Sequence, residues 1–168
     1  MKYLLGFDIG SSSVKVTLLE IASGKTVASA FSPSSEMPMQ SPQQGFAEQD
    51  PEMWWRELVN AMNKVHQQVS FTGAEVAAIG IAYQMHGLVC VDKDLQPLRP
   101  SIIWCDSRAV KIGDKAFEEL GEKHCLKSFL NSPGNFTASK LRWVKKNEPD
   151  VYKNIYKIML PGDYIAMR

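Results

Sequence analysis

The chain has 168 residues, of which 45% are hydrophobic, and its 19 lysines and arginines nearly balance its 18 aspartates and glutamates. This length suits one domain with a sizeable core. The net charge of +1, without any basic run, argues against a nucleic-acid partner. Apolar runs fall well short of the ~20 residues that cross a bilayer, and Asp8 interrupts the N-terminal apolar run before a signal peptide can form. We therefore expect a cytoplasmic protein that binds neither nucleic acid nor membrane.

The cysteines, Cys90, Cys105 and Cys125, are widely spaced and form no CxxC pair. Their number and spacing support neither a zinc site nor a disulfide framework. We expect reduced, partly buried thiols, as in most cytoplasmic proteins.

The first part of the chain has the character of β-structure. Residues 2–8 are apolar, and residues 14–21 alternate apolar with polar side chains, which is the period of a half-buried strand. A Ser-Gly-Lys turn at 23–25 leads into another β-prone run at 26–31. Strands joined by such short turns predict an antiparallel meander.

A helix is expected after the proline- and glycine-rich loop at 32–49. Asp50 is a good N-cap, and Pro51 suits the first helical position because its missing N–H has no partner there. Apolar residues then recur at steps of three and four, which predicts one buried face. These residues are Trp54, Leu58, Met62, Val65 and Val69.

The rest of the chain alternates short strands with helices. A short run rich in Val, Ile and Ala predicts a buried strand at 75–82. Further strands are expected at 88–91, 101–104 and 157–160, and helices at 107–120, at 138–147 and from 163 onward. This order predicts an α/β domain with a mixed sheet, an N-terminal meander followed by βα units, over residues 1–168. Because the last helix has barely begun at Arg168, we expect the natural protein to be longer.

The segment FDIGSSSVK at 7–15 is the first candidate site. An apolar strand leads to a carboxylate, a glycine turn, a run of hydroxyls and a cation, which suits phosphate binding by backbone N–H groups and hydroxyls. Asp8 is placed to hold Mg²⁺, directly or through water. No Walker A pattern is present, and the alternative is a β-hairpin with a serine-rich turn. The candidate phosphate-binding residues are Gly10, Ser11, Ser12, Ser13 and Lys15.

The second candidate, QMHG at 84–87, follows the expected strand at 75–82. Ligands usually lie at strand ends in α/β sheets. His86 can exchange hydrogen bonds with a sugar hydroxyl, Met85 can pack on the carbon skeleton, and Gln84 adds an amide. The alternative is that His86 has a structural role, as a lone histidine after a strand often has.

The third candidate is IWCDSR at 103–108. Trp104 offers a flat apolar face of the type that covers sugar C–H groups. Asp106 can accept hydroxyl protons, and Arg108 adds a fork of donors. The alternative is that Asp106 or Ser107 caps the next helix.

With these segments in order, the chain resembles the FGGY family of carbohydrate kinases, and within it the xylulokinases. The resemblance rests on FDIGSSSVKV at 7–16, GFAEQDPEMWW at 45–55, IGIAYQMHGLV at 79–89, RPSIIWCDSRA at 99–109 and LPGDYIAMR at 160–168. It covers the whole chain but only the first part of the family, whose members carry a second actin-like domain.

The resemblance implies an RNase H-like, actin-type ATPase fold that uses ATP and Mg²⁺. It implies that the loop from Asp8 to Lys15 meets the phosphates and that Met85 and His86 contact the ketose. Trp104 and Asp106 are expected in the same pocket. The implied reaction is phosphorylation of D-xylulose; the alternatives are another FGGY kinase acting on ribulose, gluconate, a tetritol or glycerol, and an actin-like module without sugar chemistry.

The family's general base lies near the start of the second domain, and no position of this chain matches it. We therefore expect the 168 residues to be inactive alone, because loss of a general base typically costs ~10²–10⁴-fold. Members of the family often form dimers, so a homodimer is a further expectation.

Overall fold

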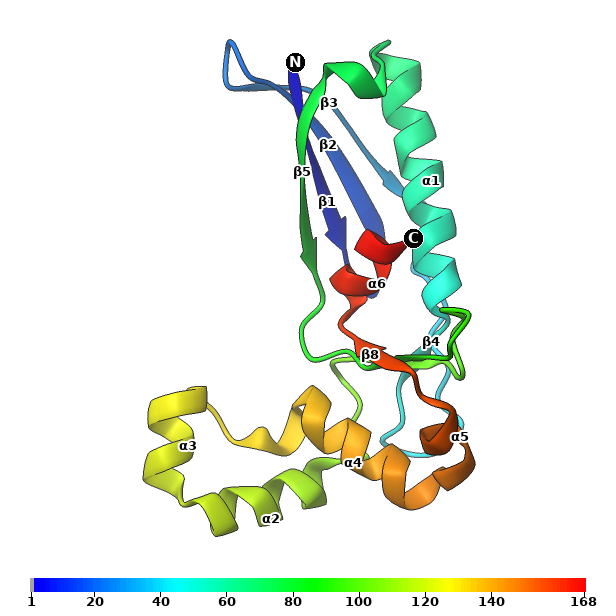
Figure 1. Cartoon of the computed structure of the whole chain (residues 1–168). Coiled ribbons are helices and arrows are strands. Elements are labelled where there is room, and N and C mark those ends of the chain that lie inside the picture. The colour runs from blue at the N-terminus through cyan, green and yellow to red at the C-terminus, as the bar shows by residue number, and fades with distance from the viewer. Residues whose placement is uncertain (1) are drawn as a thin grey trace. The chain divides into compact units, whose positions relative to one another are not determined.

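The computed structural model describes residues 2–168, which form two compact units (Figure 1). Unit 1 comprises residues 2–38, 51–84 and 161–168, and unit 2 comprises residues 39–50 and 85–160. The single domain expected from the sequence thus contains two units whose segments alternate along the chain.

Unit 1 is built on one mixed sheet with the strand order β3-β2-β1-β5. Strands β1 (Tyr3–Ile9), β2 (Val14–Glu20) and β3 (Lys25–Ser32) pair antiparallel, and β5 (Val76–Tyr83) pairs parallel with β1. The predicted meander and mixed sheet are therefore confirmed. The turns between β1, β2 and β3 are short, so antiparallel pairing of consecutive strands is the accessible arrangement.

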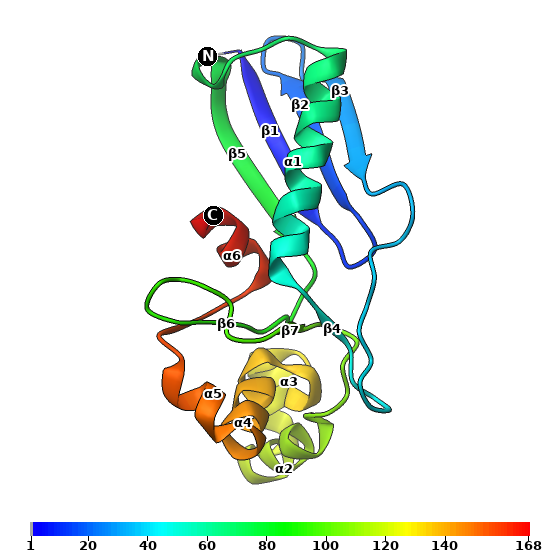
Figure 2. The ribbon, with the colours of Figure 1, turned by 90° about the vertical axis from the view of Figure 1, so that its right-hand side faces the viewer.

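Helix α1 (Pro51–Gln68) packs on β2 and β3 and covers one face of the sheet (Figure 2). It begins at the predicted proline, and its buried face contains Trp54, Leu58, Ala61 and Val65. Met62 and Val69, predicted on that face, are only partly buried. Complete burial of a large apolar side chain stabilises by about 1.5–3 kcal/mol, so this face is a main source of stability for unit 1. The buried apolar residues of β1, β2 and β3 are Tyr3, Leu5, Ile9, Val14, Val16, Leu18 and Ala28.

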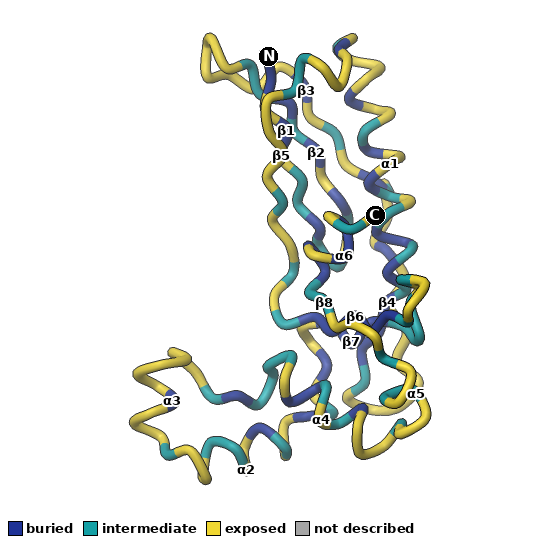
Figure 3. The backbone as a smooth tube through the Cα atoms, in the orientation of Figure 1, coloured by how far each residue is buried: buried dark blue, intermediate teal, exposed yellow. Residues whose placement is uncertain are grey.

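Strand β5 is largely exposed (Figure 3), whereas the sequence predicted a buried strand. Ile79 is 55% exposed. Among residues 2–168, β1 is the strand paired with β5, so β5 lies at an edge of the sheet. Composition alone cannot report burial, because a run of apolar residues suits an edge strand as well as a central one.

Helix α6 (Pro161–Met167) returns the chain to unit 1. Gly162 packs so closely on the Tyr83 ring that a Cβ at this position would lie 2.0 Å from a ring carbon. The Tyr164 hydroxyl donates to Glu52 of α1, and Arg168 donates to the same carboxylate at 2.9 Å. These contacts attach α6 to both β5 and α1.

Unit 2 contains short strand pairs and helices. Its strands are β4 (Glu48–Gln49) with β7 (Ser101–Ile102), and β6 (Val89–Val91) with β8 (Lys157–Met159), both antiparallel. Its α-helices are α2 (Val110–Leu120), α3 (Glu122–Phe129), α4 (Thr137–Asn147) and α5 (Pro149–Asn154). Leu88, Cys90, Ile102 and Val144 form a buried cluster.

Several elements of unit 2 differ from the prediction. The later strands form separate pairs instead of joining the main sheet. Helix α2 begins at Val110 and not at 107, because residues 107–110 form a turn in which the Val110 N–H donates to the Ser107 carbonyl. The sequence did not indicate α3, which follows Gly121 at a φ of 86°, or the short α5. No helix among residues 2–168 is both long and apolar enough to cross a membrane.

Candidate functional site

The predicted phosphate loop is the tight turn between β1 and β2. The Gly10 N–H donates to the Ser13 carbonyl at 3.1 Å, and a Cβ on Gly10 would lie 2.9 Å from that oxygen. This contact is shorter than real Cβ atoms show, so the turn requires glycine. The Ser12 carbonyl accepts from the Met37 N–H at 2.8 Å, which ties the turn to the following loop. The serine-rich turn is therefore held by backbone bonds, and its serines are partly or fully exposed.

Asp8 and Lys15 are cross-strand partners beside this turn. Lys15 Nζ lies 3.2 Å from Asp8 Oδ2, and both side chains are exposed. They alternate along their strands with buried Ile9 and Val14, so they lie on the sheet face that α1 does not cover. An exposed pair of this kind contributes about 0–1 kcal/mol. The stability of the fold therefore does not require this ion pair. The carboxylate of Asp8 and the ammonium group of Lys15 thus lie together beside the turn without a structural need.

The QMHG segment begins at the end of β5. The Gln84 N–H donates to the Ile9 carbonyl at 3.0 Å and so continues the pairing of β5 with β1. Met85 is 66% exposed, and His86 has a left-handed backbone with φ of 58°. Left-handed backbone is uncommon in residues other than glycine and is worth a functional explanation.

Residues from the start of α4 hold His86 in place. Lys140 Nζ donates to the His86 carbonyl at 2.8 Å, and the Phe136 ring stacks on the imidazole with a centroid distance of 4.9 Å. Burial, and secondly the charge of Lys140, lowers the pKa of His86. The imidazole is therefore neutral at physiological pH, when one ring nitrogen donates and the other accepts.

Trp104 is held by the same part of the chain. Its backbone carbonyl accepts from the Asn135 side-chain amide, and its side chain is 45% exposed. Asn135 directly precedes Phe136, so neighbouring residues anchor Trp104 and His86. The structure thus brings the second and third candidate segments to one support within unit 2.

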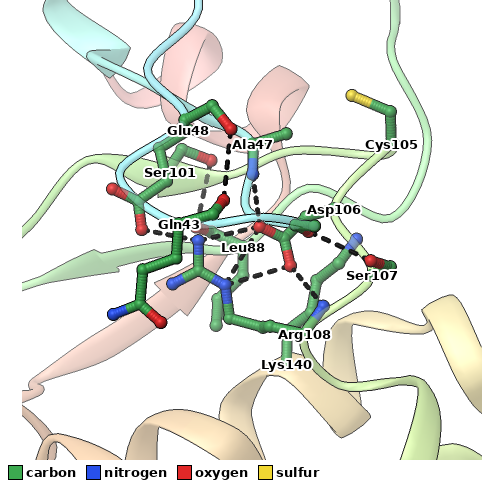
Figure 4. A network of polar contacts seen from close by, with 12 residues as sticks. Gln43, Ala47, Glu48, Leu88, Ser101, Cys105, Asp106, Ser107, Arg108 and Lys140 are labelled. Atoms are coloured by element: carbon green, nitrogen blue, oxygen red, sulfur yellow. Dashed lines mark hydrogen bonds and ion pairs between the residues drawn. The ribbon is translucent and has the colours of Figure 1, made fainter.

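Asp106 is buried and bound to protein donors (Figure 4). Its carboxylate accepts from the Ala47 N–H at 2.6 Å and from the Arg108 guanidinium at 2.7–3.0 Å. Arg108 also pairs with Glu48 at 2.7 Å and lies 3.7 Å over the Phe46 ring. These contacts favour a structural role for Asp106, and its proposed contact with sugar stays a prediction. Neither Asp106 nor Ser107 serves as the cap of α2, whose N-cap is Ala109.

The predicted site residues are distributed over both units. Asp8, the glycine–serine turn, Lys15 and Gln84 belong to unit 1, whereas Met85, His86, Trp104 and Asp106 belong to unit 2. Among residues 2–168, no three His, Cys, Asp or Glu side chains cluster as a metal site would require. An Mg²⁺ ion that is held mainly by nucleotide phosphates needs only one or two carboxylates, so Asp8 fits that use.

Sequence reasoning missed the supporting residues Asn135, Phe136 and Lys140. The available signal was Lys140, which lies one helical turn before Val144 on the buried face of α4. A charge on the buried face of a helix is unusual, because burying an ammonium group is costly unless it is compensated.

Comparisons with known proteins identify the family and the fold. The model of the FGGY family of carbohydrate kinases, N-terminal domain, matches residues 3–168. The xylulose kinase of Escherichia coli (strain K12) is 37% identical over 98% of this chain and 32% of its own length. The structure matches a xyloylose kinase from Brucella ovis, with a TM-score of 0.85 and 32% identity over 99% of this chain and 34% of that one.

A gluconate kinase from Lactobacillus acidophilus has a TM-score of 0.84 and 27% identity over 99% of this chain and 32% of its own. The chain thus spans about a third of the length of the relatives it matches. The predicted actin-like ATPase fold is confirmed by these structures. Because the family model matches residues 3–168, the chain belongs to the FGGY family of carbohydrate kinases, as an N-terminal domain.

Proposed function

We propose that this chain is the phosphate-loop and sugar-binding part of an ATP-dependent kinase that converts D-xylulose to D-xylulose 5-phosphate. The observation that carries the proposal is the 37% identity to a xylulose kinase over 98% of the chain. The exposed Asp8–Lys15 pair beside a serine turn supports phosphoryl transfer. The exposed Met85 and Trp104, with a neutral His86 beside Met85, support a sugar as the acceptor.

In this reaction a sugar hydroxyl oxygen attacks the γ-phosphorus of ATP as the bond to the β–γ bridging oxygen breaks. The enzyme contributes mainly positioning and charge stabilisation. Lys15 and the Ser11–Ser13 turn would bind phosphate oxygens through an ammonium group, hydroxyls and backbone N–H groups. Asp8 would hold Mg²⁺, which neutralises phosphate charge when bound with the nucleotide.

On the sugar side, Met85 and Trp104 would cover C–H groups, and His86 would exchange hydrogen bonds with a hydroxyl. We assign no general base to this chain; the hydroxyl proton is expected to pass to an aspartate elsewhere in the full-length protein. Cytoplasmic location and homodimer formation stay predictions.

A second candidate is another kinase of the same family, and the structural match to a gluconate kinase specifically favours gluconate. Glycerol is disfavoured by the resemblance to xylulokinases at the QMHG segment, residues 84–87. An actin-like scaffold without sugar chemistry does not account for the exposed Met85 and Trp104.

The test is coupled ADP release by the full-length protein with D-xylulose, D-ribulose, gluconate, erythritol as a tetritol, and glycerol. Preference for D-xylulose is expected, with the 168-residue chain inactive in parallel. Preference for gluconate would show that gluconate, and not D-xylulose, is the acceptor, while the phosphoryl transfer from ATP would stand as proposed. Absence of turnover with every sugar, together with binding of ATP, would overturn the proposal in favour of the scaffold.

A further inference from the structure

We propose that Lys140 is a positioning residue that holds the Met85–His86 turn in its sugar-binding conformation through the His86 carbonyl. This inference rests on the function proposed above, because the turn is useful only if it meets a sugar. It assigns a role to a residue outside the phosphate and sugar segments themselves.

The first support is the burial of a charge at this position. Lys140 is 0% exposed, and its side chain extends from α4 towards the Asp106–Arg108 pair (Figure 4). An ammonium group carries only donors, and burying it is costly unless acceptors compensate. The His86 carbonyl is such an acceptor, at 2.8 Å from Nζ. A methionine would fill similar space without this cost, so packing alone does not explain a lysine here.

The second support is the conformation of the residue that Lys140 binds. His86 is left-handed, with φ of 58°, and a side chain disfavours this backbone because Cβ crowds the following carbonyl. Such a residue keeps its conformation only when its surroundings impose it. Lys140 holds the His86 carbonyl by a hydrogen bond, and Phe136 holds the His86 imidazole by stacking. Together they set the direction of the imidazole and of exposed Met85, which directly precedes it.

The third support is the electrostatic setting of the ammonium group. Burial lowers the pKa of Lys140 to about 8, while Asp106 and Cys105 act to raise it and Arg108 to lower it. The carboxylate of Asp106 is shared with Arg108, so it compensates Lys140 only in part. At physiological pH most Lys140 is charged, which strengthens its bond to the His86 carbonyl and opposes protonation of the imidazole.

The experiment compares Lys140→Met, Lys140→Arg and the control Lys146→Met in the full-length protein. Lys146 lies on the same helix but is exposed. We expect Lys140→Met to raise the KM for the preferred sugar roughly tenfold or more, the shift in the conformational equilibrium of the turn that loss of one hydrogen bond from a charged group would give, with the KM for ATP unchanged. Lys140→Arg, which keeps charged donors, should restore part of the loss, and Lys146→Met should change neither constant.

A purely structural role predicts a different result. It would lower thermal stability and active concentration in Lys140→Met but leave the KM for sugar in the folded enzyme unchanged, and that outcome would overturn the proposal. Equal changes in both KM values would also overturn it, because the effect would then not be local to the sugar turn.

A second readout does not depend on turnover. The His86 imidazole is titrated by NMR in ¹³C-histidine-labelled protein, with His86→Gln identifying the signal. In Lys140→Met the pKa of His86 should rise, because the repelling charge is gone; in Lys140→Arg and Lys146→Met it should stay low. An unchanged pKa of His86 in Lys140→Met would show that the ammonium group does not act on the imidazole, and would overturn its placement at the His86 backbone. If the unaltered protein phosphorylates no sugar, the proposed function fails while this titration still tests the contact.

Discussion

Lys15 Nζ lies 3.2 Å from the Asp8 carboxylate, directly across the antiparallel pairing of β1 and β2. Both groups are exposed and adjoin the turn that requires glycine at position 10. An ion pair in water adds little to stability, whereas a fixed carboxylate and cation at a strand turn are what Mg²⁺ and a phosphate oxygen require.

Asp8→Asn and Lys15→Met should lower sugar-dependent ADP release by the full-length protein on the order of 10²–10³-fold, the usual effect of losing one preorganised electrostatic group. Their free energy of unfolding should change by less than about 1 kcal/mol, because the pair is exposed. Urea unfolding and coupled kinetics check both statements, with exposed Lys25→Met on β3 as the control. Turnover at the unaltered rate in Asp8→Asn would refute the assignment of Asp8.

Asp106→Asn should destabilise the protein by about 1–3 kcal/mol, because it removes one of the two carboxylates that lie 2.7 Å from the buried Arg108 guanidinium and leaves Glu48 as the other. The control is Asp150→Asn, whose exposed pair with Lys153 should be worth less than about 1 kcal/mol. Chemical unfolding measures both changes. Unaltered stability of Asp106→Asn, with a raised KM for sugar, would instead support direct sugar binding by Asp106.

Lys140 should make stability depend on pH in the alkaline range. Its folded pKa of about 8 lies below the ordinary 10.5, so between these values the unfolded chain binds the proton and the folded chain does not. Stability therefore rises with pH from about 8 to 10.5, by up to about 1.4 kcal/mol per pH unit from this group. The slope of the free energy of unfolding should be smaller in Lys140→Met. Parallel pH profiles for the two proteins would contradict the lowered pKa.

Gly113→Ala should destabilise unit 2 by about 1–3 kcal/mol, the typical effect of overpacking. A Cβ at Gly113 would lie 2.2 Å from the Gly134 Cα, and backbone cannot move aside as a flexible side chain can. Gly73→Ala is the matched control, since its Cβ would meet nothing within 4 Å and its φ is not positive. Thermal unfolding of the two variants should differ clearly, and equal melting temperatures would contradict the close approach of α2 (Val110–Leu120) to residue 134.

Thiol labelling should distinguish Cys105 from the other cysteines. Cys105 is exposed, whereas Cys90 and Cys125 are buried, and burial raises the pKa of Cys90 to about 11. Because the thiolate is the reactive form, Cys90 should react only after unfolding. Mass spectrometry after a short iodoacetamide pulse should find the label on Cys105. Equal labelling of Cys90 in the native protein would show that its surroundings open readily.

Patterns among near neighbours in the sequence predicted the N-terminal strands and the first helix. The alternation at 14–21 and the short turns around it predicted the meander, because strand period and turn chemistry act between near neighbours. Asp50 and Pro51 predicted the start of α1 (Pro51–Gln68), since helix capping is also local. The short β1–β2 connection placed Asp8 and Lys15 at opposite ends of one turn, and the antiparallel register then made them partners.

Long-range packing decided the rest. Whether β5 (Val76–Tyr83) is buried depends on which strands flank it, and its apolar composition does not reveal those neighbours. The sequence left sugar binding and helix capping open for Asp106, and only folding brought the Ala47 N–H, 59 residues away along the chain, to its carboxylate. Lys140 lies 54 residues from His86, so their contact exists only once α4 (Thr137–Asn147) packs beside the QMHG turn. The sequence by itself determined the N-terminal meander, the start of α1 and the residue types of the candidate site. The tertiary structure decided which groups are buried together, because burial and contact are properties of the packed chain.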